Sequence, residues 1–172
     1  MQINMIRAEA KDAATVSSIL TKAARYLDSI DQTLWQCEDL SVESIAADVD
    51  AGLYFLAWAE GEAVGTLRFQ LEDPMCWPDI QLGSSTFIHR LAIRRNAAGK
   101  GVSSRMLDWA KLTTRQLGRR FLRLDCAIRP KLCAVYEKNG FTKHSERQIG
   151  PYHVVRYEFD AEHYDQAGQY DG

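Results

Sequence analysis

Several features that would place this 172-residue chain in a special class of proteins are missing from its sequence. It has no apolar run near the roughly 20 residues that a membrane-spanning helix needs, and its N-terminus lacks a signal-peptide pattern. The formal net charge of −2 gives no reason to expect nucleic acid or an anionic membrane as a partner. We therefore expect a cytoplasmic protein.

The sequence also lacks the residue spacings typical of metal sites and of disulfide frameworks. Its four cysteines are Cys37, Cys76, Cys126 and Cys133, and no two of them form a C-x-x-C pair. The four histidines show no spacing typical of metal ligands either. We expect reduced, mostly buried thiols and no bound metal.

What remains is the composition of an ordinary globular domain. The chain is 46% hydrophobic and 26% charged, which is usual for a soluble protein. Its length is sufficient for one hydrophobic core, and no internal repeat or linker divides it. We predict one domain over residues 1–160, followed by a polar tail at 161–172.

Hydrophobic periodicity predicts how strands and helices follow one another. Apolar residues at three- and four-residue spacing predict helices over 13–27, 42–49, 102–117 and 130–138. Asp12 and Ser41 are good N-cap residues, and Pro130 suits a first helical turn. Strands are predicted at 2–7, 53–60, 63–71, 87–93, 121–127 and 153–159, and another strand starts at 141–143. The predicted order is β-α-α-β-β-β-α-β-α-β-β.

The stretch at 86–107 has the layout of an anion-binding site. An apolar strand leads into the turn Gly99-Lys100-Gly101, and a helical pattern follows it. The first N–H groups of a helix have no partner inside the helix, and glycines let the backbone approach a phosphate closely. The spacing matches neither a P-loop nor a dinucleotide-binding fingerprint. An ordinary tight turn is therefore an equal alternative on this evidence alone.

A second stretch, AVYEKNGF at 134–141, favours the anion site. Together with the glycine turn it resembles the GCN5-related N-acetyltransferase (GNAT) family, whose pyrophosphate loop precedes a Tyr-Glu-Lys-x-Gly-Phe segment. The resemblance covers most of the chain. It implies an α/β fold of the α+β type, with a mixed central sheet flanked by helices. Two of its strands splay apart in the family and leave a cleft for acetyl-coenzyme A (acetyl-CoA).

The resemblance also implies which residues bind the coenzyme. Backbone N–H groups of the turn would hold its pyrophosphate, and the end of the central strand would pair with its pantetheine arm. Ala98 stands where the family has a basic or amide residue, and Arg94, Arg95 and Lys100 are nearby cations that either hold coenzyme phosphates or are solvated surface charges. The implied cofactor-binding residues are Leu91, Ala92, Ile93, Ala98, Gly99, Lys100, Gly101, Val102, Ser103 and Ser104.

Two residues are candidates for proton transfer. Tyr136 matches the family's tyrosine beside the coenzyme sulfur, and a phenol can donate a proton to a thiolate of similar basicity. The alternative is a tyrosine that packs against Phe141. On the central strand, His89 shares a face with Leu91 and Ile93 by alternation, so it either accepts the amine proton or is a core histidine.

Four further residues are predicted to contact the acceptor. Arg90 would meet a carboxylate of the substrate, while Trp35, Trp77 and Tyr152 lie on predicted loops near the family's acceptor cleft or serve as local hydrophobic anchors. Arg129 stands where many members have an asparagine that contacts the coenzyme.

The resulting hypothesis is an acetyltransferase. Acetyl-CoA would be the co-substrate, a small-molecule amine the acceptor, and the transfer direct in a ternary complex. Alternatives are acetylation of a protein lysine or N-terminus, and a non-catalytic sensor of acyl-CoA. We expect no nucleic-acid or membrane partner, and a monomer or a homodimer.

Overall fold

The structure is a computed structural model that describes residues 1–165. Its seven strands are hydrogen-bonded in the order β1-β2-β3-β4-β5-β7-β6. The strands are β1 (Asn4–Arg7), β2 (Tyr54–Ala59), β3 (Glu62–Gln70), β4 (Ser85–Ile93), β5 (Phe121–Ala127), β6 (Thr142–Ile149) and β7 (Tyr152–Asp160). The helices are α1 (Ala13–Ser29), α2 (Val42–Asp50), α3 (Val102–Gln116) and α4 (Pro130–Lys138), with 3-10 turns η1 (Ala10–Asp12), η2 (Cys37–Leu40) and η3 (Arg95–Ala97). The predicted mixed sheet with flanking helices is confirmed.

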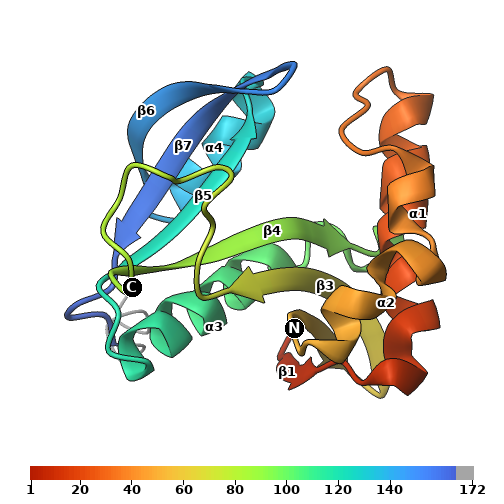
Figure 1. Ribbon diagram of the computed structural model, residues 1–172. Helices are drawn as coiled ribbons and strands as arrows, with labels where there is room; N and C mark the ends of the chain where they lie inside the picture. The colour runs from red at the N-terminus through yellow and green to blue at the C-terminus, as the bar shows by residue number, and fades with distance from the viewer. Residues whose placement is uncertain (166–172) are drawn as a thin grey trace. The chain divides into compact units, whose positions relative to one another are not determined.

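The chain forms two compact parts, and strand β4 contributes to both. The first part holds Met1–Phe69 and Arg90–Met106. In it, β2 pairs antiparallel with both β1 and β3, and α1 lies beside α2 (Figure 1). Apolar residues at helical spacing bury one face of each helix against apolar strand residues. This core contains Val16, Ile19, Leu20, Ile45, Val49, Tyr54 and Leu56.

The helix starts of the first part differ from one another in how they are capped. Ser41 caps α2 as predicted, because its hydroxyl accepts a hydrogen bond from the N–H of Ser44 at 3.2 Å. Asp12 precedes α1 but makes no cap to it. Its carboxylate instead accepts a hydrogen bond from the N–H of Glu9 at 2.9 Å, because a 3-10 turn begins before the helix.

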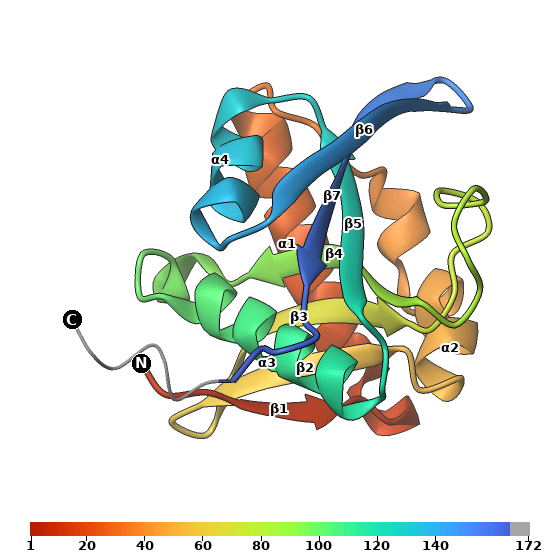
Figure 2. The same ribbon diagram turned by 90° about the vertical axis from the view of Figure 1, so that its left-hand side faces the viewer.

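The second part holds Gln70–His89 and, within the described residues, 107–165. The first three residues of β4 pair in parallel with β5, and β7 pairs antiparallel with β5 and β6. Figure 2 shows these last three strands as neighbouring ribbons with α4 next to them. The buried side chains of this second part include Phe87, Leu122, Leu124, Phe141 and Tyr157.

Buried cations fix the long 71–84 connection of the second part. The guanidinium of Arg156 is buried and donates two hydrogen bonds to the carboxylate of Asp79, at 2.7 and 2.9 Å. The indole of Trp77 is buried, and its ring centroid lies 4.3 Å from the guanidinium of Arg156 and 5.2 Å from that of Arg123. Cation–π contacts of this kind hold the loop against the strands.

Lys111 is a buried lysine of helix α3. Its side chain is 3% exposed, and its ammonium donates to the carbonyl oxygen of Asn139 at 2.7 Å. The ammonium also lies 4.5 Å from the ring centroid of Phe159. Burial lowers the pKa of this lysine, against the opposing effect of Asp108.

The start of the predicted tail packs on the protein. Ala161 is buried, and the hydroxyl of Tyr164 donates to the carboxylate of Asp108 at 3.0 Å. The remainder of that predicted segment, 166–172, lies outside the residues that the structure describes. Within residues 1–165 we find no helix with the length and apolar character needed to cross a membrane.

Candidate active site

The glycine turn joins η3 to the start of α3 in the first part of the chain. Gly99 and Gly101 have φ angles of 74° and 77°, a region in which side chains other than glycine are strained. A Cβ atom built on either glycine would meet nothing within 4 Å. Packing therefore does not require glycine here, whereas the backbone conformation does.

The backbone of this turn leaves a row of donors without partners. No described residue accepts a backbone hydrogen bond from the N–H groups of residues 99–104. The N–H of Ala98 does have a partner, because it donates to the carbonyl oxygen of Arg95 at 3.2 Å. Free N–H groups at a helix N-terminus favour an anion. The turn can thus bind an anion through residues 99–104, while the N–H of Ala98 is already used.

Strand β4 before the turn departs from regular alternation. Arg90 has a φ angle of 51°, an uncommon value for a residue with a side chain. Its guanidinium donates to the hydroxyl of the buried Tyr54 at 3.0 Å. An alternation argument assumes extended backbone throughout, so the predicted shared face of His89, Leu91 and Ile93 does not follow across Arg90.

His89 is held by two carboxylates in the second part. Its Nε2 lies 2.8 Å from Oδ2 of Asp73, and its Nδ1 lies 3.8 Å from Oδ1 of Asp125. Asp73 also accepts a hydrogen bond from the backbone N–H of Cys76 at 3.2 Å. When His89 is neutral, it donates its Nε2 proton to ionised Asp73, so its Nδ1 is left as the basic nitrogen.

The pKa values of the two carboxyl groups are shifted in opposite directions. Burial alone would raise the pKa of Asp73, but its hydrogen bond with His89 and the charge of that ring hold the pKa below the usual value. Burial raises the pKa of Asp125, and His89 opposes this shift. The Oδ1 atom of Asp125 is buried and has no hydrogen-bond partner among the described residues. This atom is thus suited to take up a proton or a positive charge.

These three side chains are also the group that could hold a cation. One ligand atom from each of Asp73, His89 and Asp125 lies within 4.8 Å of the other two. The direct hydrogen bond between His89 and Asp73 accounts for the close approach without an ion. Sequence reasoning missed both aspartates. A signal was present for Asp125, because a carboxylate inside the apolar strand FLRLDCA is unusual.

Tyr136 lies on α4, where Pro130 begins the helix and Gly140 follows its end. Its ring packs edge-on against Phe141, with 5.9 Å between the centroids, and lies 6.1 Å from Tyr157. Burial raises the pKa of the phenol, and the nearby groups Cys126, Asp125 and Cys133 raise it further. No hydrogen bond of the hydroxyl occurs among the described residues, so Tyr136 is a protonated phenol with a free donor.

Comparison with known proteins assigns the family. The model of the acetyltransferase (GNAT) family matches residues 19–141, more than half of the chain. The chain belongs to the GNAT family. It is therefore an acyltransferase of the N-acetyltransferase type, as the glycine turn and the AVYEKNGF stretch predicted.

Relatives of this GNAT protein cover nearly all of its length. It is 26% identical over 160 residues to YesJ, an uncharacterized N-acetyltransferase of Bacillus subtilis, with 88% of each chain covered. A GNAT acetyltransferase from Listeria monocytogenes has the same fold, with a TM-score of 0.77, 20% identity and coverage of 92% of this chain and 94% of the other. An aminoglycoside acetyltransferase in complex with coenzyme A gives a TM-score of 0.73 at 15% identity, covering 92% and 95%.

The structure places the predicted acceptor contacts of this GNAT protein in different surroundings. Trp35 is partly buried against the core of the first part, and Arg90 is engaged by Tyr54. Trp77 is 2% exposed, which suits an anchor of its loop, whereas Tyr152 is 61% exposed at the start of β7. Of the two predicted aromatic contacts in the second part, Trp77 and Tyr152, only Tyr152 is exposed enough to meet a ligand.

Proposed function

We propose that this protein transfers the acetyl group of acetyl-CoA directly to a primary amine of a small molecule, with both substrates bound together. The observation that carries the proposal is the turn at 99–104, whose N–H groups have no backbone partner within residues 1–165, in a chain of the GNAT family. A row of N–H donors at the start of a helix matches the charge of a pyrophosphate. The complex of the related aminoglycoside acetyltransferase with coenzyme A supports the choice of co-substrate.

The proposed coenzyme site uses backbone groups more than side chains. The N–H groups of Gly99, Lys100, Gly101, Val102 and Ser103 bind the pyrophosphate, and the hydroxyls of Ser103 and Ser104 add contacts. Leu91, Ala92 and Ile93 offer backbone groups to the pantetheine arm. Ala98 lies at the start of the turn but offers no free N–H, because its own N–H donates to the carbonyl oxygen of Arg95.

His89 is proposed as the base that accepts the amine proton. Asp73 fixes the ring by its 2.8 Å hydrogen bond and leaves Nδ1 free to accept. The imidazolium that forms would lie between two carboxylates, which stabilises its charge. The amine nitrogen, now neutral, forms a bond to the thioester carbon, the carbon–sulfur bond breaks, and the new amide nitrogen releases its surplus proton to solvent.

Tyr136 is proposed as the acid that protonates the leaving sulfur. The raised pKa keeps its phenol protonated before transfer. The proton moves from the hydroxyl to the thiolate as the carbon–sulfur bond breaks. His89 then releases its proton to solvent, and the tyrosinate regains one from solvent. The free hydroxyl supports this role, because no acceptor among the described residues competes for its proton.

The test is release of coenzyme A thiol in the presence of a panel of amines. The panel holds a polyamine, an aminoglycoside, an amino acid and a lysine-containing peptide, and the blank contains acetyl-CoA without an amine. Thiol release with a small amine above the blank supports the proposal. Release with the peptide alone would identify a protein acceptor. Acetyl-CoA binding by calorimetry without release for any amine would identify a sensor.

A further inference from the structure

A hollow of about 240 Å³ lies in the first part, between helix α1 and the end of strand β4. Its apolar lining residues are Ile19, Ala23 and Ile93. Its polar lining residues are Asn96 and the cations Lys22, Arg94 and Arg95, and no carboxylate of the described residues lines it. A small hollow that combines hydrocarbon with positive charge suits an organic anion.

The cations of this hollow have no anionic partners in the described part of the chain. Neither Lys22 nor Arg94 nor Arg95 forms an ion pair with a described residue. By contrast, Arg68 in the same part pairs with Asp48 at 2.9 Å. Like charges that lie near one another repel, so a bound anion would relieve repulsion at this site.

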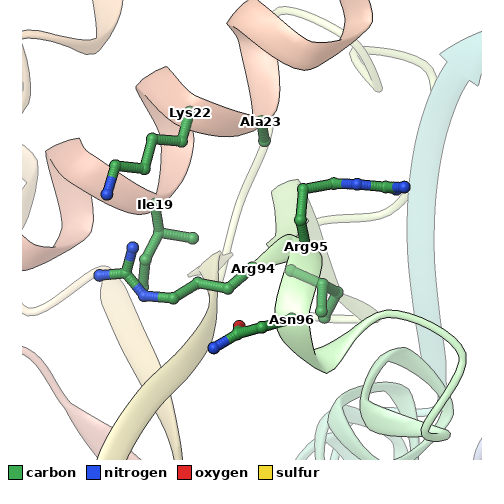
Figure 3. A pocket seen from close by; sticks show the side chains of 7 residues that line it. Ile19, Lys22, Ala23, Arg94, Arg95 and Asn96 are labelled. Carbon is green, nitrogen blue, oxygen red and sulfur yellow. The ribbon is translucent and has the colours of Figure 1, made fainter.

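Protein groups hold the two arginines in fixed positions. The Nε of Arg94 donates to the carbonyl oxygen of Ala63 at 2.8 Å, which leaves its terminal N–H groups for a ligand. The guanidinium of Arg95 lies 3.8 Å from the ring centroid of Tyr26. Figure 3 shows Lys22, Arg94 and Asn96 extending to the same side, whereas Arg95 extends to the opposite side. Lys22 and Arg94 are therefore the pair that can meet one anion.

A neighbouring hollow shows that this charge is local. It has about 270 Å³ and is lined by Lys100 and Asn96, but also by Glu60 and Glu62. Two carboxylates offset Lys100 and the N-terminal ammonium of Met1, so this hollow has no excess of positive charge that would favour an anion. Positive charge without carboxylates is thus a property of the Lys22–Arg94 hollow and not of every depression near the glycine turn.

We propose that the Lys22–Arg94 hollow binds the oxyanion of a small organic molecule, a carboxylate or a phosphate. The ammonium of Lys22, the terminal N–H groups of Arg94 and the amide of Asn96 bind its oxygens. A guanidinium fixed at one nitrogen loses little freedom when it binds such a group. The apolar stem of the ligand packs on Ile19, Ala23 and Ile93. This oxyanion belongs either to the coenzyme or to a separate molecule, such as an acceptor that carries an acid.

Calorimetric titration with glutarate and with inorganic phosphate, at constant ionic strength, tests the proposal without any need for acetyl transfer. We expect Lys22→Gln and Arg94→Gln each to weaken glutarate binding about tenfold or more, as loss of a charge-assisted contact does. Arg25 is exposed on the same helix and does not line the hollow, so Arg25→Gln is the matched control. Lys22 makes no hydrogen bond among the described residues, so its variant should fold normally.

Repeating the titration with saturating acetyl-CoA identifies the source of the oxyanion. Glutarate binding that persists assigns the hollow to a separate anion, and binding that disappears assigns it to a coenzyme phosphate. In the second case, dephospho-coenzyme A shows whether that phosphate is the one on the ribose. Absence of glutarate and phosphate binding to the parent protein would overturn the proposal. Equal weakening by Lys22→Gln and Arg25→Gln would overturn it as well, because general charge would then explain the effect.

Discussion

Replacing Tyr136 with phenylalanine removes one hydroxyl and leaves the packing of the ring in place. The hydroxyl has no hydrogen-bond partner among the described residues, and the ring keeps its contacts with Phe141 and Tyr157. The free energy of unfolding should therefore change by less than about 0.5 kcal/mol. Affinity for acetyl-CoA should also stay the same, because the sulfur carries no charge before transfer.

The rate of acetyl transfer should fall. A positioned acid contributes about 10²–10⁴-fold. Burial raises the pKa of Tyr136 and makes its phenol a weaker acid than a solvated one, so we expect an effect near or somewhat below the lower end of that range. We expect kcat to drop by about tenfold to a thousandfold, or about 1.4–4 kcal/mol of barrier. Single-turnover thiol release, with acetyl-CoA affinity measured by calorimetry, separates rate from binding.

Tyr157→Phe is the matched control. The hydroxyl of Tyr157 donates to Oε1 of Glu137 at 2.7 Å, and Glu137 is exposed enough to regain water when that bond is lost. This variant should lose about 1 kcal/mol of stability and keep its kcat. Tyr136→Phe should thus lose rate and keep its stability, whereas Tyr157→Phe should lose stability and keep its rate. Full activity in Tyr136→Phe, or an equal loss of rate and binding, would refute the assignment of Tyr136 as the acid.

Three further predictions concern the turn, the base and the loop anchor. Gly101 and Gly118 flank helix α3 at opposite ends, with φ angles of 77° and 72°. Replacing either with alanine should therefore cost about 1–2 kcal/mol of stability. Only Gly101→Ala should also weaken acetyl-CoA binding, by tenfold or more in calorimetry. His89→Gln should lower kcat most at low pH and recover part of it as the pH rises toward the pKa of the amine, whereas an unchanged pH–rate profile would exclude this base. The hydrogen bond of Arg156 holds the pKa of Asp79 below its usual value, so the pair stabilises the fold above about pH 4 and loses its effect as the pH falls further. Because Asp79 is 45% exposed, Asp79→Asn should cost only about 1–2 kcal/mol in denaturant titrations at neutral pH and should flatten that acid dependence.

The elements of this fold were predictable because each one has a local signal. Strand alternation, the Ser41 cap and the glycines that follow helices occur within a few residues of the structure that they specify. The predicted cap at Asp12 was wrong, because a competing local interaction uses its carboxylate, which accepts a hydrogen bond from the N–H of Glu9. Element boundaries shifted by only a few residues.

The surroundings of His89 could not be predicted, because they depend on packing between distant segments. Asp73 lies 16 residues before His89, on a loop without periodicity, and Asp125 lies on another strand. The left-handed conformation of Arg90 also had no signal, since arginine rarely adopts it. The glycine turn was different, because two glycines before a helix specify both its conformation and its donors.

The burial of Lys111 has a consequence for its chemical modification by the proposed co-substrate, acetyl-CoA. Acetyl-CoA reacts with neutral, accessible amines, and burial enlarges the neutral fraction of Lys111 by lowering its pKa. The same burial denies the reagent access, because the side chain is 3% exposed and its nitrogen is bound to Asn139. Acetylation of Lys111 would therefore require local opening of the fold. Mass spectrometry of protein aged with acetyl-CoA should find exposed lysines such as Lys22 modified and Lys111 spared, so that a modified Lys111 marks molecules that have unfolded.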